Sequence, residues 1–112
     1  ESDADYLASK CSALRVFDDE NGKMNLSLND AEGSMLLISQ FTLHAMTKKG
    51  NRPSFIRSAK PEKANPLYDY FIRKMKSLVK NEIKTGVFGA NMQVELINNG
   101  PITILIDSKN KE

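Results

Sequence analysis

The sequence predicts an α/β fold with two helices and about five short strands in a largely antiparallel sheet. Two segments carry apolar residues at helical spacing, and several shorter ones alternate or are continuously apolar. Short turns join most of the expected strands, and such turns connect antiparallel neighbours. A length of 112 residues allows one domain, so residues 1–112 are expected to fold as a single unit.

The first helix is expected over residues 3–14. Its helical spacing is carried by Leu7, Cys11 and Leu14. Ser2 followed by Asp5 resembles a capping box at its start. The second helix is expected to begin with Asn65 as N-cap and Pro66 as its first residue, and to run to about Lys80. Its apolar stripe comprises Leu67, Phe71, Met75 and Leu78.

The strands are expected at residues 15–17, 24–28, 35–41, 92–97 and 102–106. Asn21-Gly22 is a strong turn signal between the first two. The nearly unbroken apolar runs 35–41 and 102–106 are typical of strands buried on both faces. Such strands need partners on both edges. We therefore expect a partner chain, or N-terminal strands missing from this chain, to complete the sheet.

Composition excludes several functional classes. With Cys11 as the only cysteine and His44 as the only histidine, an internal disulfide and a multi-histidine metal site are excluded. No metal or cofactor is expected. No apolar run is long enough for a transmembrane helix, and the acidic start is not a signal peptide, so we expect a cytoplasmic protein without a membrane partner.

One stretch is strongly basic, although the net charge is only +2. Its cations are Lys48, Lys49, Arg52, Arg57, Lys60 and Lys63. Glu62 is the single acidic residue among them. The stretch is either a phosphate-binding surface or a solvated loop, and the sequence alone supports both interpretations about equally.

Three segments contain residues suited to chemistry. Ser39-Gln-Phe-Thr-Leu43 ends an apolar strand, and in an extended chain Thr42 shares a face with His44. Thr42 is then either a nucleophile beside a base or a strand-favouring residue next to a surface histidine. Gly100-Pro101 is either a cis peptide or part of a plain hairpin turn. Phe88-Gly-Ala-Asn-Met92 forms a shallow pocket wall or packs in the core.

Together these segments resemble the D-aminoacyl-tRNA deacylases, also described as the D-Tyr-tRNA deacylase family. The resemblance rests on Leu14-Arg-Val-Phe17, Asp19 to Leu26, Ser39 to Leu43, Lys49-Gly50, Arg52 to Phe55, Thr85-Gly86, Phe88 to Ala90 with Met92, and Asn99 to Pro101 with Thr103. Each motif is weak alone, but they occur in order from Asp3 to Asp107. Two residues depart from the family pattern, His44 for tyrosine and Met46 for aspartate, and the family's N-terminal β-hairpin is absent.

The resemblance implies a barrel-like, mostly antiparallel sheet with two helices packed outside, assembled as a homodimer with the active site at the interface. It implies hydrolysis of D-aminoacyl-tRNA, and of glycyl-tRNA mischarged on tRNA-Ala. The implied residues are Gln40, Phe41 and Thr42 for catalysis, Ser39, Phe88, Ala90 and Met92 for substrate binding, and Gly100 and Pro101, joined by a cis peptide bond, as a main-chain filter that rejects L-residues.

No general base emerges from the sequence, so we favour attack by water assisted by the substrate's own ribose hydroxyl over covalent catalysis by Thr42. Backbone N–H groups near Phe41 and Thr42 are expected to hold the oxyanion. Two alternatives stay open. One is a non-catalytic nucleic-acid-binding homologue associated with DNA replication; the other is an inactive homologue that serves only as a dimer partner.

Overall fold

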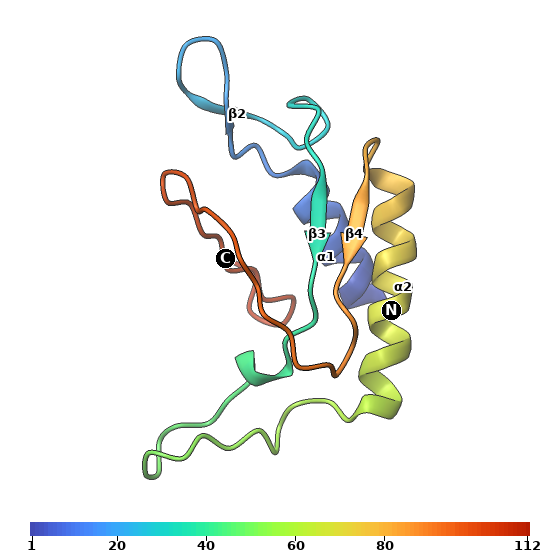
Figure 1. The fold of residues 1–112 in the computed structure, drawn as a ribbon, viewed down its shortest axis with the longest axis vertical. Helices are drawn as coiled ribbons and strands as arrows, with labels where there is room; N and C mark the ends of the chain where they lie inside the picture. The colour runs from blue at the N-terminus through green and yellow to red at the C-terminus, as the bar shows by residue number, and fades with distance from the viewer.

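Two helices and four short strands form the ordered elements of the computed structural model, which describes residues 1–112. In chain order they are α1 (Ser2–Ala13), β1 (Phe17–Asp18), β2 (Met24–Leu26), β3 (Met35–Leu37), the 3-10 helix η1 (Phe41–Leu43), α2 (Pro61–Leu78) and β4 (Ile83–Thr85). The helices lie side by side, and β3 and β4 lie next to them (Figure 1). The predicted α/β class with two helices is confirmed.

The strands form two separate two-stranded sheets, not the single barrel-like sheet that was expected. β1 and β2 are an antiparallel hairpin around the predicted turn, where Gly22 adopts a φ of 74°. β3 and β4 pair in parallel, with Met35 opposite Ile83. The expectation of a largely antiparallel sheet is therefore wrong for this pair. Helix α2 connects β3 to β4, and a connection through a helix brings the second strand back in the same direction.

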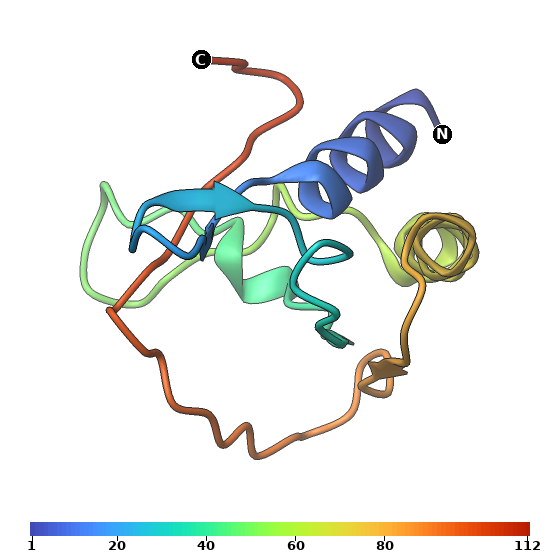
Figure 2. The ribbon, with the colours of Figure 1, turned by 90° about the horizontal axis from the view of Figure 1, so that it is seen from above.

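Three predicted strands differ from the structure. The run 35–41 forms a strand only over Met35–Leu37, and Leu36 in its middle is 57% exposed. Residues 92–97 and 102–106 pair with no strand, and Ile97 is 93% and Leu105 90% exposed. After β4 the chain swings out on the side away from the helices (Figure 2). Apolar sequence favours a strand, but a strand needs a neighbouring backbone, and this chain offers none at these positions.

The core lies where α1 crosses α2. Its four clustered buried residues are Ala8, Leu28, Met75 and Val79. The small side chain of Ala8 lets the two helices approach closely, and Met75 fills the space between them without any exposed surface. Cys11 packs against the same cluster, and burial raises the pKa of its thiol. The predicted stripe of α2 thus contributes Phe71, Met75 and Leu78 to this core, whereas α1 contributes Ala8 with Cys11, and Leu7 and Leu14 of its predicted stripe do not belong to the cluster.

The helix starts differ from those predicted. α1 begins after Glu1, and no side chain caps it, so the Ser2–Asp5 capping box does not form. α2 begins at Pro61 and contains Pro66 within it, whereas Asn65 and Pro66 were expected at its start. Pro61 satisfies the same preference for proline in the first helical turn. Neither α1 nor α2 has the length and apolar character that crossing a bilayer would require.

Candidate functional site

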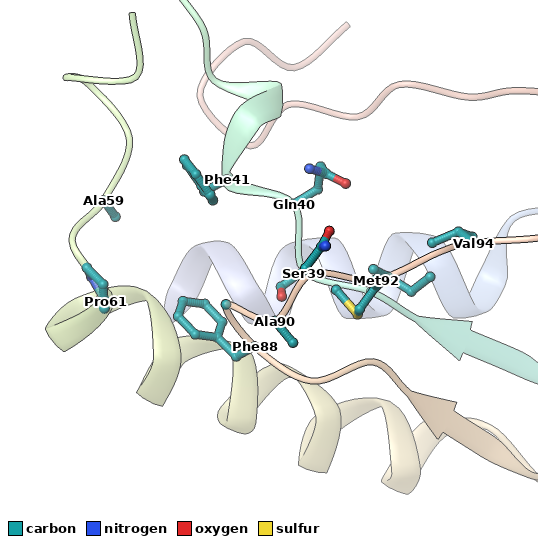
Figure 3. A pocket seen from close by; sticks show the side chains of 12 residues that line it. Ser39, Gln40, Phe41, Ala59, Pro61, Phe88, Ala90, Met92 and Val94 are labelled. Carbon is teal, nitrogen blue, oxygen red and sulfur yellow. The ribbon is translucent and has the colours of Figure 1, made fainter.

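A cavity of about 360 Å³ lies beyond the carboxyl ends of β3 and β4 (Figure 3). Its lining consists of Ile38, Ser39, Gln40, Phe41, Ala59, Pro61, Phe88, Gly89, Ala90, Asn91, Met92 and Val94. Three parts of the chain contribute: the segment after β3, the start of α2 with the residue before its N-cap, and the segment after β4. The cavity thus joins residues that lie more than fifty positions apart in the sequence, from Ile38 to Val94.

Parallel pairing of β3 and β4 creates this cavity, because parallel strands end at the same edge of a sheet. The Leu37 carbonyl at the end of β3 accepts two hydrogen bonds, from the Gly86 amide at 2.8 Å and from the Tyr68 hydroxyl of α2 at 2.9 Å. A side chain at Gly86 would lie only 2.8 Å from the Met92 sulfur. Glycine at this position therefore leaves room for the Met92 side chain, which packs against the backbone at the end of β4.

Six of the residues named from the sequence line this one cavity. Ser39, Gln40 and Phe41 enter it from the β3 side. The other three, Phe88, Ala90 and Met92, enter it from the β4 side. The Phe88 ring also contacts Tyr68 of α2, with ring centroids 6.1 Å apart. The structure brings these two motifs together, while the roles of the individual side chains remain predictions.

Thr42 lies outside the lining, and the structure does not support its pairing with His44. The two residues were expected on one face of an extended chain, but Thr42 lies in η1 and His44 caps it. The Thr42 hydroxyl accepts a hydrogen bond from the Gln40 amide at 2.5 Å, and His44 is exposed without a side-chain hydrogen bond. Helical backbone separates side chains two positions apart, so His44 is not positioned as a base for the Thr42 hydroxyl.

Gly100 and Pro101 do not line the cavity of their own chain. Their peptide bond is cis, as the family resemblance implies. The neighbouring Asn98, Asn99 and Ile102 lie against β1, around a separate hollow. Gly100 has a φ of 130°, and a side chain there would lie 3.0 Å from Ile102. The position therefore requires glycine.

Four of the lining residues lie outside the segments named from the sequence: Ile38, Ala59, Pro61 and Val94. Gly89 and Asn91 belong to the predicted wall segment 88–92, although neither was named as a site residue. Pro61 carried a usable signal, since a proline a few residues before an apolar helical stripe marks a possible helix start. Ala59 carried none, because its place in the lining depends on how the loop before α2 folds back.

The lining contains no acidic, basic, histidine, cysteine or tyrosine side chain, so no residue of the cavity can act as a general base. Its polar side chains are Ser39, Gln40 and Asn91. The amide N–H groups of Phe41 and Thr42 donate to no other group of the protein. The cavity can bind a partly apolar ligand, and Phe41, one of its lining residues, has an unpaired backbone donor.

Fold and site together define a small α/β protein with an uncharged ligand cavity at the carboxyl edge of a parallel strand pair. Residues 1–107 match the model of the D-Tyr-tRNA(Tyr) deacylase family, and the chain belongs to this family. It is 59% identical to the D-aminoacyl-tRNA deacylase of Cytophaga hutchinsonii and 55% identical to that of Akkermansia muciniphila. Both matches span the whole chain and 75% of each relative.

Among solved structures, the c-Myc DNA Unwinding Element Binding Protein is similar to this chain with a TM-score of 0.78. The two are 38% identical, and the match covers 90% of this chain and 68% of the other. The fold is therefore shared with a protein whose name refers to DNA.

Proposed function

We propose that this protein is a hydrolase that cleaves the ester bond of D-aminoacyl-tRNA, releasing free D-amino acid and tRNA. The observation that carries the proposal is the cavity that joins Ser39, Gln40 and Phe41 to Phe88, Ala90 and Met92. Relatives that are 55% and 59% identical to this chain are named D-aminoacyl-tRNA deacylases. The family match over residues 1–107 supports one deacylase domain. Translation takes place in the cytoplasm, and we place the enzyme there.

The substrate supplies the proton-transfer group that the cavity lacks. While the water oxygen bonds to the ester carbonyl carbon, the ribose hydroxyl next to the ester relays a proton: it accepts one from the water and donates its own toward the departing ribose oxygen. The free N–H groups of Phe41 and Thr42 stabilise the oxyanion that forms. The bond to the ribose oxygen then breaks, and that oxygen receives the proton. Water and ester are thus converted to a carboxylic acid and a ribose hydroxyl.

Replacing Thr42 by alanine is expected to lower turnover of D-tyrosyl-tRNA less than about tenfold. The Thr42 hydroxyl contacts only Gln40 and no base, so its removal takes away no nucleophile. Deleting a covalent nucleophile costs on the order of a millionfold in a serine hydrolase. Single-turnover kinetics separate the two cases. A loss near the larger value, or an acyl-enzyme trapped on Thr42, would establish the covalent route instead.

Selection by chirality requires a second copy of the chain in this proposal. Gly100 and Pro101 lie outside their own cavity, so in a homodimer those of one protomer would approach the cavity of its partner. Exposed Ile97 and Leu105 flank them and would be covered in such an assembly. Main-chain carbonyls aimed at the substrate amino group and Cα leave no room for an L side chain. Glycine, without a side chain, would pass, so glycyl-tRNA mischarged on tRNA-Ala would also be cleaved.

The test is release of tyrosine from D-tyrosyl-tRNA and from L-tyrosyl-tRNA. We expect kcat/KM to favour the D-ester by more than roughly 200-fold, because rejection by steric clash exceeds what a missing methylene provides. Glycyl-tRNA should be cleaved as well. Equal rates for both tyrosyl esters would exclude the filter, and no cleavage of either would exclude the activity.

The solved neighbour named for DNA binding favours one alternative, a nucleic-acid-binding protein without catalysis. Binding of a DNA duplex without any release of tyrosine in the same assay would establish that alternative.

A further inference from the structure

The segment between η1 and α2 is an extended arm with many uncompensated positive charges. We call residues 45–63 the basic arm; its cations are Lys48, Lys49, Arg52, Arg57, Lys60 and Lys63. All six are exposed, and none takes part in an ion pair. Glu62 is the only acidic residue in this range. Of the ten cations outside the arm, Lys74, Lys84 and Lys109 each pair with a carboxylate.

The arm has a defined shape. Met46 and Ser54 form two backbone hydrogen bonds of 2.8 and 3.0 Å, which bring the two sides of the arm together. Gly50 lies between them with a φ of 72°, a conformation that suits glycine at a turn. Lys48, Lys49 and Arg52 surround this turn. Three cations are therefore presented together at the tip, which projects away from the helices (Figure 1).

The base of the arm is attached to the cavity. The Ser58 hydroxyl donates a hydrogen bond of 2.7 Å to the Phe41 carbonyl. The Phe55 ring meets the Phe41 ring edge to face, with centroids 5.4 Å apart. Ala59 and Pro61, which follow in the sequence, line the cavity itself. The arm thus starts four residues after Phe41 of the cavity wall, contacts Phe41 through Phe55 and Ser58, and reaches another part of the same wall at Ala59 and Pro61.

We propose that the basic arm binds the phosphates of the RNA strand whose esterified end occupies the cavity. The inference rests on the proposed function and adds the surface that recognises the polyanion. The cavity lining has no cation, so it cannot itself hold phosphates. The nucleotides that precede the esterified end must leave the cavity at its mouth, where the arm is attached. Lysine and arginine without internal partners are suited to neutralising such phosphates.

The test compares two esters of the same amino acid, D-tyrosyl-tRNA and D-tyrosyl-adenosine, the second of which has no phosphate. The arm variant combines Lys48→Ala, Lys49→Ala and Arg52→Ala. For D-tyrosyl-tRNA we expect kcat/KM to fall by about tenfold or more at low salt. The slope of log kcat/KM against log salt should decrease by about three, or about one for each cation removed. The contribution of the arm is measured by dividing kcat/KM for D-tyrosyl-tRNA by kcat/KM for D-tyrosyl-adenosine. This ratio should be lower in the arm variant than in the unmodified protein.

A matched control combines Lys23→Ala, Lys76→Ala and Lys80→Ala. These three lysines are exposed, have no ion-pair partner and lie at the opposite end of the molecule, around the β1–β2 hairpin and the end of α2 (Figure 1). The control loses the same charge, so it separates local binding from net charge. We expect both of its kcat/KM values to remain close to those of the unmodified protein.

Two results would overturn the arm assignment while leaving the deacylase activity intact. One is a ratio for the two esters that is the same in the arm variant and the unmodified protein. The other is weaker binding of a DNA duplex by the arm variant with unchanged cleavage of D-tyrosyl-tRNA. If the unmodified protein cleaves neither ester, the proposed function itself fails, and the assignment of the arm to this RNA fails with it.

Discussion

Replacing Ala90 by phenylalanine is expected to lower kcat/KM for D-tyrosyl-tRNA by at least about a hundredfold. Ala90 lines the cavity of about 360 Å³, and a benzyl group at this position would occupy space that the ester needs. Displacing a bound substrate by about 1 Å can cost two orders of magnitude in rate. Ala90 is exposed to the cavity rather than packed in the core, so the fold should be retained. Steady-state kinetics with a circular dichroism spectrum would measure both effects.

Ala31→Phe is the matched control for this substitution. Ala31 is exposed in the turn between β2 and β3, outside the cavity lining. The same bulk is added there without reaching the site, so activity should be preserved. Near-normal cleavage by the Ala90→Phe variant would show that the ester binds elsewhere.

Replacing Met75 by alanine is expected to lower the free energy of unfolding by roughly 2–5 kcal/mol. Met75 is fully buried at the centre of the four-residue core cluster, where α1 crosses α2. Only five of the 112 residues are buried, so few other contacts can compensate for the cavity left behind. Domains are commonly stable by about 5–15 kcal/mol, and the loss is a large share of that range. Urea denaturation followed by circular dichroism would measure it.

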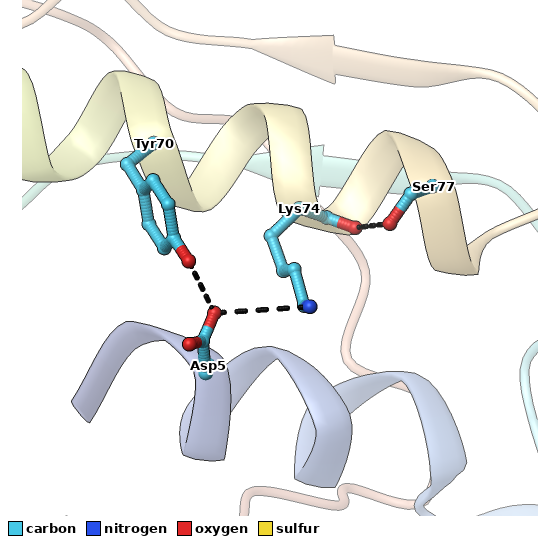
Figure 4. A network of polar contacts seen from close by, with 4 residues as sticks. All are labelled: Asp5, Tyr70, Lys74 and Ser77. Carbon is cyan, nitrogen blue, oxygen red and sulfur yellow. Dashed lines mark hydrogen bonds and ion pairs between the residues drawn. The ribbon is translucent and has the colours of Figure 1, made fainter. Parts of the chain in front are cut away.

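A polar contact between the same helices provides the comparison. The Tyr70 hydroxyl donates a hydrogen bond of 2.6 Å to the Asp5 carboxylate, and the Lys74 ammonium lies 3.8 Å from the same oxygen (Figure 4). The bond to the Asp5 carboxylate raises the pKa of the Tyr70 hydroxyl. Tyr70→Phe removes this bond at a partly solvated position, and we expect a clearly smaller loss than for Met75→Ala. Equal losses would mean that the polar contact stabilises the packing of the helices as much as the buried methionine does.

Local pattern predicted the parts of this protein whose structure is local. The helical spacing of Leu7, Cys11 and Leu14 located α1 to within one residue at each end, because a helix satisfies its own backbone hydrogen bonds. Asn21-Gly22 located the β1–β2 turn for the same reason. The start of α2 was missed by several residues because two prolines compete for the first turn and only the folded chain selects Pro61.

The residues of the candidate site were also largely recognisable from their motifs. Ser39 to Phe41, and Phe88 with Ala90 and Met92, resembled one family before any geometry was known. The sequence motifs did not show how these two segments come to line one cavity. That depends on β4, which was not among the predicted strands, and on its parallel pairing with β3.

The amino-acid order thus specified the helices, the hairpin turn and the motifs that carry the family's chemistry, since each depends on neighbours a few residues away. Tertiary folding decided the parallel strand pair, the cavity at its edge, the attachment of the basic arm to Phe41 and the absence of strands after β4. Strand pairing and cavity walls join residues far apart in the chain, so whether they form depends on which distant backbone is available.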